Sequence, residues 1–370
     1  MEVNYGKSAP FSLGIEEELQ LLSPESYELV SRFDEVAEAA GEDERIKAEL
    51  LQSTVEVATH VHGSVTAAIE EARTLRRRLR DAAAERGALI ASAGTHPYSR
   101  YEHQDVTEQA RYRELIDAMQ WTAERQLIFG LHVHVGMESA AQAIAVTNAL
   151  RTWLPELLAL SASSPFWLGR DTGLASTRIK VFDTFPRTGL PPAFASFEEY
   201  ELLVERGVRT GSFRDYTYIW WDLRPHPRLG TIEVRICDAQ TRLETVAALT
   251  ALIQALAATL AERHREQGTL QTQPVTLVNE NKWRAARYGL EAQLVDLERD
   301  TERPAREALR ALVDLAEPAA QRLGSVPELG LVERVLERGS GAEEQRAAYA
   351  ESGSLLAVAK FLAEETVREV

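Results

Sequence analysis

Carboxylate and imidazole side chains recur at alternating positions in four short segments of the sequence. They are Glu16 and Glu18, Glu56, His132 and His134, and Glu233 beside Arg235. Alternate side chains of a β-strand share one face, so two neighbouring carboxylates on a face lie roughly 7 Å apart. That spacing suits one or two hard divalent cations, and an oxygen-rich site with one nitrogen favours Mg²⁺ or Mn²⁺. If the four segments are neighbours in one sheet, they predict a metal site on its polar face.

The same residues also admit structural interpretations. Glu16 and Glu18 would suit the solvated outer face of a strand, and Glu233 with Arg235 would suit a salt bridge across one face. A lone histidine in a strand is usually structural, whereas two on one face, flanked by glycines that open space, favour a ligand or substrate site. The metal interpretation is strengthened because several separate segments repeat the arrangement.

Alternation of apolar and polar residues predicts that each segment is a strand. The predicted strands are 12–22, 50–59, 88–95, 126–137, 216–223 and 231–237. The stretch 216–223 is aromatic and leads through a predicted turn, 224–230, into the last strand. Glu17 falls in the apolar row of the first strand, which predicts a place near an open end of the sheet.

Helices are expected to pack against the apolar face of this sheet. Ser64 predicts an N-cap for a helix that ends at Gly87, and its LRRRLR stretch is read as a solvated face rather than a phosphate site. The other predicted helices are 31–40, 107–125, one begun by Ser139 and broken near Pro155, one capped by Ser196, and 243–267. From 243 to 370 the chain is expected to be mostly helical, after sheet-forming motifs over about 11–240. The pattern predicts an α+β fold in a single catalytic domain, 1–370.

Composition excludes several classes of partner. The net charge of −16 argues against nucleic acid and against an anionic membrane surface. Cys237 is the only cysteine, which excludes an intrachain disulfide and a thiolate metal cluster. The chain shows no signal peptide, and its most apolar stretch, 246–261, is judged too short to span a bilayer. A cytoplasmic location is expected, and apolar positions in the C-terminal helices leave room for a homodimer.

A carboxylate box with arginines nearby has the chemistry that phosphoryl transfer from ATP requires. Divalent ions bridge the phosphate oxygens, and guanidinium groups neutralise charge on the group being transferred. The sequence contains no GxxxxGK[ST] loop and no GxGxxG after a strand, so metal ions and arginines would hold the nucleotide. The long polar segment 161–178, with arginines at both ends, is expected to be functional.

Six motifs in this order resemble glutamate–cysteine ligase family 2, in its carboxylate–amine ligase branch. They are GIEEEL, STVEVAT, GLHVHVGM, SASSPFWLGRDTGLASTR, RPHPRLGTIEVRICDAQT and ENKWRAARYGL, and they span about residues 11–290. The resemblance implies a glutamine-synthetase-like fold, in which a curved, mainly antiparallel sheet carries the active site and helices pack behind it. The sequence His60-Val61-His62 departs from the more proline-like residues expected after STVEVAT, at the edge of the substrate pocket.

The resemblance also implies roles for individual residues. Arg235 would contact the ATP phosphates and an acyl phosphate, with Glu233 beside it as part of the catalytic machinery. Arg178, Arg170 and Lys282 would bind nucleotide or a substrate carboxylate. The implied ligands of two or three Mg²⁺ ions are Glu16, Glu18, Glu56, His132 and Glu233.

The implied reaction joins a carboxylate to an amine with ATP as the driving reagent. The carboxylate, expected to be the γ-carboxylate of glutamate, becomes an acyl phosphate that an amine then attacks, with cysteine as the default amine. Two alternatives stay open: a metal-dependent hydrolase that uses the same carboxylate box, and a nucleotide-binding member of the fold without catalysis. A requirement for ATP, a carboxylate and an amine together would distinguish the ligase from both.

Overall fold

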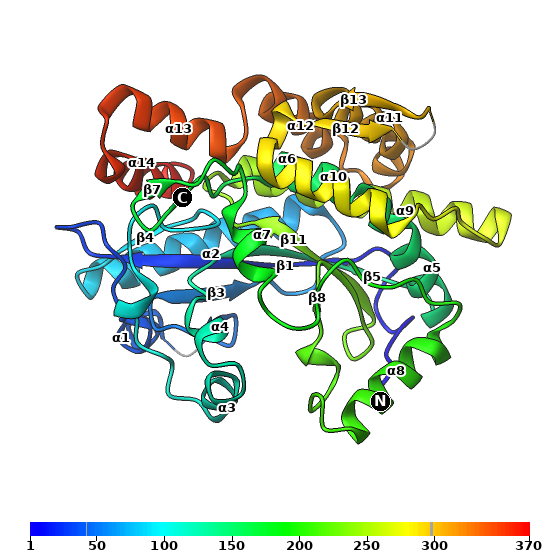
Figure 1. Ribbon diagram of the computed structural model, residues 1–370, viewed down its shortest axis with the longest axis horizontal. Coiled ribbons are helices and arrows are strands. Elements are labelled where there is room, and N and C mark those ends of the chain that lie inside the picture. Colours follow the sequence, from blue (N-terminus) through cyan, green and yellow to red (C-terminus); the bar gives the residue numbers. More distant parts are fainter. Residues whose placement is uncertain (42, 297–298) are drawn as a thin grey trace.

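A seven-stranded sheet forms the centre of the computed structural model, which describes residues 1–41, 43–296 and 299–370 (Figure 1). The strand order is β10-β11-β5-β1-β3-β2, with β4 also beside β1, and every pairing is antiparallel. These strands are β1 (Leu13–Leu22), β2 (Ile46–Ala48), β3 (Thr54–Ala58), β4 (Leu89–Ala91), β5 (Gly130–Gly136), β10 (Leu223–His226) and β11 (Thr231–Asp238). The predicted α+β architecture, a curved antiparallel sheet backed by helices, is confirmed.

Strand register separates an apolar face of this sheet from a polar one. Ile15 pairs with Val133, and Val133 pairs with Val234 on the next strand, so branched side chains meet on the apolar face. One position along, Glu16 pairs with His132, so charged groups meet on the opposite face. Because side chains alternate strictly, pairing of the apolar rows aligns the polar rows as well.

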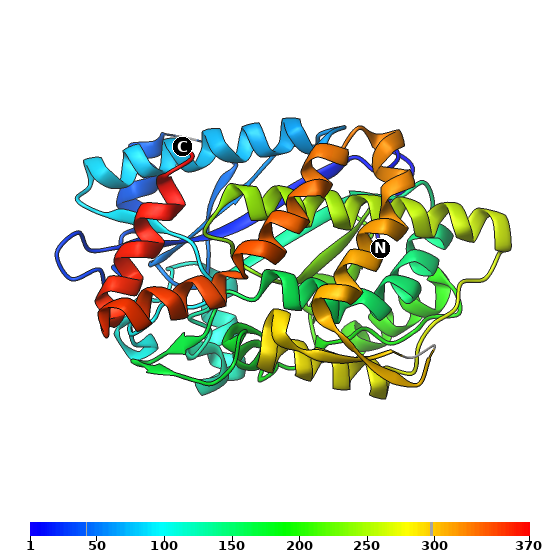
Figure 2. The ribbon, with the colours of Figure 1, turned by 90° about the horizontal axis from the view of Figure 1, so that it is seen from above.

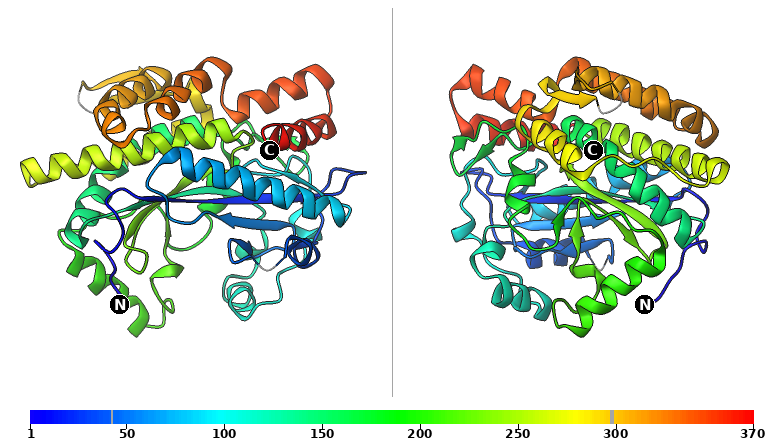
Figure 3. Two further views of the ribbon diagram at one scale, coloured as in Figure 1. Left: turned by 180° about the vertical axis from the view of Figure 1, so that it is seen from behind. Right: turned by 45° about the vertical axis from the view of Figure 1, so that its right-hand side comes forward.

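Long helices cover the apolar face, as the views from above and behind show (Figures 2 and 3). They are α2 (Val65–Glu85), α5 (Ala140–Leu150), α6 (Leu154–Ser161) and α9 (Leu243–Gln267). Ser64 and Ser139 cap α2 and α5 through bonds to the amides of Ala67 and Gln142, as the sequence predicts. Burial of their apolar stripes against the strands forms the largest core cluster of the protein.

Helix α9 is the core helix of the molecule. Its 25 residues make it long and apolar enough to cross a membrane, yet 94% of its most apolar window is buried inside the protein. The sequence prediction judged residues 246–261 too short to span a bilayer, but the helix extends beyond both of these bounds and is long enough. Its burial, and not its length, is what identifies it as a core helix. Two further helices pack directly on α9 on the side away from the sheet: α11 (Ala305–Leu323) and α12 (Val326–Arg338).

The rest of the C-terminal part adds α10 (Val275–Tyr288), α13 (Gly341–Ser352) and α14 (Leu355–Val367). A β-hairpin of β12 (Gln293–Asp296) and β13 (Thr301–Pro304) interrupts this helical region, which the sequence prediction did not include. On the polar side of the sheet, shorter elements form flanking walls (Figure 1). They are α3 (Ala110–Met119), α4 (Trp121–Glu124), α7 (Thr177–Phe182), α8 (Phe197–Arg209), β8 (Thr188–Gly189) and β9 (Trp220–Trp221). Helix α1 (Phe33–Ala40) packs instead with α2 on the apolar side, and the strand pair β6 (Phe166–Trp167) and β7 (Arg170–Asp171) lies beside α14.

The aromatic stretch 216–223 is not the continuous strand that its composition predicts. It begins as a 3₁₀ turn, Tyr216–Tyr218, because the Asp215 side chain accepts a hydrogen bond from the amide of Thr217. The short strand β9 follows and pairs with β8, outside the main sheet. The predicted turn instead contains β10, and Pro225 is tolerated in this strand because β10 lies at the edge of the sheet.

Glu17 does not lie near an open end of the sheet, and the arginine-rich stretch of α2 is not wholly solvated. Arg76 is fully buried and donates to both oxygens of Glu17, at 2.5 and 3.1 Å. The same guanidinium donates to the carbonyls of Gln240 and Thr241, at 2.7 and 2.8 Å. This ion pair ties α2 to the apolar face of β1, directly behind the carboxylates of the polar face.

We expect Arg76→Ala to lower the free energy of unfolding by about 3–5 kcal/mol, because it leaves the Glu17 carboxylate buried without its partner. The neighbouring Arg77 is exposed, so Arg77→Ala is the matched control, with an expected change within about 0.5 kcal/mol. Urea unfolding followed by circular dichroism measures both. Equal midpoints for the two variants would show that the buried pair adds no stability.

Candidate active site

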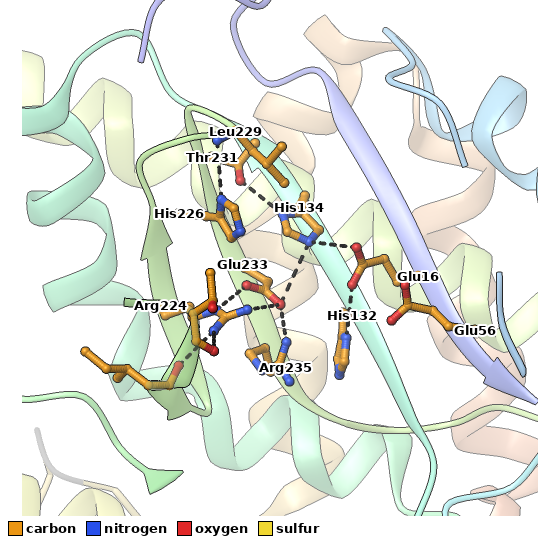
Figure 4. Close-up of polar contacts among 12 residues, drawn as sticks. Glu16, Glu56, His132, His134, Arg224, His226, Leu229, Thr231, Glu233 and Arg235 are labelled. Carbon is orange, nitrogen blue, oxygen red and sulfur yellow. Dashed lines mark hydrogen bonds and ion pairs between the residues drawn. The ribbon is translucent and has the colours of Figure 1, made fainter. Parts of the chain in front are cut away.

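Two clusters of titratable groups lie on the polar face of the sheet, and Figure 4 shows the first of them together with Glu56 of the second. The first contains Glu16, His134 and Glu233, and the second contains Glu18, Glu49 and Glu56. Within each cluster, one ligand atom from every residue lies within 4.8 Å of the others. The polar groups predicted from four separate segments are therefore brought together on neighbouring strands.

The first cluster depends on the pairing of β1, β5 and β11. Nε2 of His134 lies 3.6 Å from the Glu16 carboxylate and 3.8 Å from that of Glu233. Its Nδ1 lies 3.0 Å from the Thr231 hydroxyl, which orients Nε2 toward both acids. His132 contacts only Glu16, through Nδ1 at 3.3 Å. The imidazole placed between two acids is thus that of His134, although the family resemblance names His132.

The second cluster lies next to the first, two residues further along β1 at Glu18. Glu18 and Glu56 are opposite each other on β1 and β3, and Nζ of Lys47 on β2 lies 3.1 Å from Glu56. Glu49, in the turn after β2, completes the cluster. Sequence reasoning missed Glu49 because a turn residue belongs to no alternating pattern.

Like charges dominate the electrostatics of the second cluster. Burial and the Glu18 carboxylate raise the pKa of Glu49 to about 7. Burial, with the carboxylates of Glu16 and Glu49, raises the pKa of Glu56 well above its usual range. In the protein alone these raised pKa values favour protonation of Glu49 and Glu56, and a divalent cation would reverse that preference.

The first cluster is balanced by positive charge. Burial opposes ionisation of Glu233, but Arg224 and Arg235 hold its pKa well below the usual range. Burial likewise opposes the charge on Glu16, but His134 and His132 keep its pKa low. Burial also disfavours a charged His134, yet Glu233 and Glu16 raise the pKa of this imidazole.

The donor sets of both clusters fit divalent metal ions. The second cluster offers only carboxylate oxygens, which Mg²⁺ and Mn²⁺ prefer, and the first offers two carboxylates and one imidazole. Nε2 of His134 and Nε2 of His132 are both buried and form no hydrogen bond with the described residues, so each could offer a lone pair to a metal.

Three arginines lie around the clusters. The side chain of Arg235 forms an ion pair with Glu233, and its backbone amide donates to the carbonyl of Asp222 at 2.8 Å. Arg224 on β10 donates to the other oxygen of Glu233 at 2.5 Å. Sequence reasoning missed Arg224 because it lay in a predicted turn. Arg178, at the start of α7, is buried and donates to the carbonyls of Arg235 and Ile236, both at 3.3 Å.

Two residues that were predicted to bind nucleotide or substrate, Arg170 and Lys282, lie outside the cavity at the clusters. Arg170 is exposed in β7 and is not among the residues that line the cavity at the clusters. Lys282 is buried in α10, where Nζ lies 2.7 Å from Asp222 and 3.1 Å from Asp183. Both carboxylates neutralise its charge, so Lys282 has a structural contact in place of a free ammonium.

A cavity of about 670 Å³ opens onto the clusters. Its charged lining includes Glu16 and the whole second cluster, together with Arg178, Arg224 and Arg235. Its apolar lining is aromatic and aliphatic and includes Tyr112, Leu115, Ile128, Phe182, Phe185 and Trp220. The volume and the mixed lining are typical of a site for small molecules that carry both charged and apolar parts.

Gly130 makes room for the arginine at this cavity. A Cβ at this position would overlap the Arg178 guanidinium and approach Nε2 of His132 to 3.0 Å, and the Gly130 amide donates to Glu18 at 2.5 Å. We expect Gly130→Ala to displace Arg178 and to lower kcat/KM for ATP by about a hundredfold. Gly14 on β1 is the matched control, because a Cβ there meets nothing within 4 Å. Steady-state kinetics of both variants tests this, and equal loss in the two would remove the special role of Gly130.

Comparison with known proteins agrees with this geometry. The family model described as glutamate–cysteine ligase family 2 matches residues 12–361. Two proteins of Rubrobacter xylanophilus, provisionally named glutamate–cysteine ligases 2-1 and 2-3, are 44% and 45% identical to this chain. The alignments cover 99% of this chain in both cases, and 97% and 100% of the two relatives.

A similar fold has been solved. The crystal structure of glutamate–cysteine ligase from Francisella tularensis in complex with AMP superposes with a TM-score of 0.72 at 14% identity. The match covers 97% of this chain and 90% of that one, which establishes the likeness of the fold. On the family match and the full-length relatives, this chain belongs to glutamate–cysteine ligase family 2, a family of ATP-dependent carboxylate–amine ligases.

Proposed function

We propose that this ligase uses ATP and Mg²⁺ to activate the γ-carboxylate of glutamate as an acyl phosphate and joins it to an amine, with cysteine as the default. The supporting observation is a single cavity lined by Glu16 of the first cluster, all three acids of the second, and Arg178, Arg224 and Arg235. Few other chemistries need so many carboxylates facing several guanidinium groups in a space of this size. Mn²⁺ is the expected substitute for Mg²⁺, because both prefer oxygen ligands.

The two clusters would each hold one metal ion. Glu16, Glu233 and the imidazole of His134 would ligate one ion, with His132 beside it. Glu18, Glu49 and Glu56 would ligate the other ion. Bound in this way, the ions would neutralise phosphate charge and align the nucleotide. Arg235 and Arg224 orient Glu233, and Lys47 contacts Glu56, so protein groups position the acids in advance.

We expect His134→Asn to weaken Mn²⁺ binding by about ten- to a hundredfold, because His134 lies between Glu16 and Glu233. His132→Asn, a change on the same strand, is the matched comparison and should have the smaller effect. Electron paramagnetic resonance of Mn²⁺ reports the free ion in each titration. The reverse order would return the ligand role to His132, as the family resemblance implies.

The remaining work of the reaction falls to the arginines and the shape of the cavity. A carboxylate is a poor electrophile at neutral pH, and transfer of the γ-phosphoryl group onto its oxygen converts it into an acyl phosphate as ADP departs. The amine nitrogen then attacks the acyl carbon, the carbon–oxygen bond to phosphate breaks, and the nitrogen loses a proton. Arg235 and Arg178 lie where they would stabilise charge on the transferred group.

One incubation tests the proposal. The purified protein is mixed with ATP, Mg²⁺, glutamate and a panel of amines that includes cysteine, and release of ADP and phosphate is followed. Phosphate release that requires both glutamate and an amine supports the ligase. Hydrolysis of a substrate without ATP would favour the hydrolase alternative, and ATP binding without turnover would favour the non-catalytic alternative.

Three further expectations from the sequence stay predictions. They are one catalytic domain over 1–370, a cytoplasmic location and a homodimer. Sedimentation at several protein concentrations measures the oligomeric state directly.

A further inference from the structure

A second cavity, of about 460 Å³, lies on the other side of the molecule from the acidic clusters. Its walls come from α6, the C-terminal half of α9, the β12–β13 hairpin and α11, which lie together on the helical side of the sheet (Figure 1). None of its lining residues lines the catalytic cavity. Its volume falls within the range of small-molecule sites.

The cavity combines an apolar floor with a few charged groups. Trp153, Leu260, Leu312 and Leu315 supply apolar surface, and the charged side chains are Glu156, Arg263, Arg303 and the ion pair of Asp296 with Arg299. Apolar walls with a few convergent polar groups are typical of a binding site rather than of a packing defect.

Glu156, in the first turn of α6, has one carboxylate oxygen without a hydrogen-bond partner among the described residues. Its Oε2 atom is buried and forms no hydrogen bond with any described residue. Burial raises the pKa of this carboxyl to about 7, against the opposing charge of Arg303. A buried acid without a partner is destabilising, and a basic nitrogen from a ligand would remove that cost.

Two guanidinium groups in the same cavity are available to an anion. Arg263 on α9 makes no hydrogen bond or ion pair with the residues that the structure describes. Arg303 uses one nitrogen to donate to the Glu307 carbonyl at 2.8 Å, and its other donors form no hydrogen bond with the residues that the structure describes. Guanidinium pairs with carboxylate in a planar, two-pronged geometry.

We propose that this cavity binds a small zwitterion with an apolar side chain, of the α-amino acid or short-peptide class. The ammonium group pairs with Glu156, the carboxylate pairs with Arg263 and Arg303, and the side chain lies against Trp153 and Leu312. The site is separate from the catalytic cavity, so its occupancy does not depend on the proposed reaction.

Leucine and two analogues, each of which lacks one of its charged groups, test the proposal. Calorimetric titration at pH 8 uses leucine, 4-methylpentanoate, which lacks the amine, and isopentylamine, which lacks the carboxylate. The protein is the full chain with Glu233→Gln, so that turnover is suppressed. We expect saturable binding of leucine, and weaker binding of each analogue by at least about tenfold, because each analogue loses one charged contact.

Two substitutions locate the binding. Glu156→Gln in the same background should weaken leucine binding by at least about tenfold, whereas Glu266→Gln, an exposed residue at the end of α9, should leave it unchanged. Leucine should also change tryptophan fluorescence, and Trp153→Phe should remove that signal while binding persists. Melting curves verify that each variant is folded.

The outcomes are separable from those of the proposed function. Absence of binding by leucine, equal binding of 4-methylpentanoate, or an affinity unaffected by Glu156→Gln would each overturn the zwitterion site, whatever the wild-type enzyme does with ATP. Failure of ATP turnover with retained leucine binding would instead count against the ligase proposal alone.

Discussion

Glu233→Gln is expected to reduce the rate of ADP formation by about a thousandfold while the protein stays folded. Glu233 is fully buried, and its carboxylate contacts Arg224, Arg235 and His134. The amide keeps the shape of the side chain but removes the negative charge on which a divalent ion in this cluster depends. A loss of several kcal/mol of charge stabilisation corresponds to a factor of about 10³ in rate.

Three measurements make this result decisive. ADP formation gives the rate, Mn²⁺ titration gives the number of bound ions, and circular dichroism gives the melting temperature. Glu205→Gln, an exposed position on α8, is the matched control and should keep full activity. Near-normal turnover in Glu233→Gln would show that this residue is not part of the active site. A large fall in the melting temperature would show that its role is purely structural.

Arg235→Lys is expected to lower kcat by about a hundred- to a thousandfold, although the charge is conserved. The Arg235 side chain forms an ion pair with Glu233 while its backbone amide is anchored to Asp222. A guanidinium can contact Glu233 and a phosphate oxygen at the same time through its planar fork, whereas an ammonium acts as a point charge. Loss of one oriented donor to the developing charge typically costs about 10²–10³ in kcat.

The comparison for this prediction is Arg228→Lys in the exposed turn between β10 and β11, which should behave as the wild type. Separate determination of kcat and KM for ATP distinguishes the roles of Arg235. A fall in kcat supports a contact made in the transition state, and a rise in KM alone would indicate ground-state binding of the nucleotide. Kinetics unchanged in both parameters would contradict any phosphate role.

The polar face of the sheet illustrates how much could be read from the chain. The alternation in β1, β5 and β11 predicted which side chains share a face, because a strand turns successive residues to opposite sides wherever it lies. That local rule placed Glu16, Glu18, His132, His134 and Glu233 on one side before any strand order was known. Long motifs also carried the family resemblance, and the comparisons confirm it.

Other features depended on contacts between segments far apart in sequence. Glu49 joins the second cluster from a turn, and Arg224 reaches Glu233 from an edge strand, so neither follows a periodic pattern. Arg170 and Lys282 resembled ligands in sequence, but the fold leaves one exposed and pairs the other with two aspartates.

The amino-acid sequence by itself determined the strands that carry the predicted site (β1, β3, β5 and β11), the face on which their acids lie, and the family. Only the tertiary structure decided strand order, which imidazole lies between Glu16 and Glu233, and that Arg76 neutralises Glu17 behind the sheet. The physical reason is the distance along the chain over which each feature is determined. Alternation is a property of a few consecutive residues, whereas strand partners and buried charge pairs are set by how distant segments pack their apolar surfaces together.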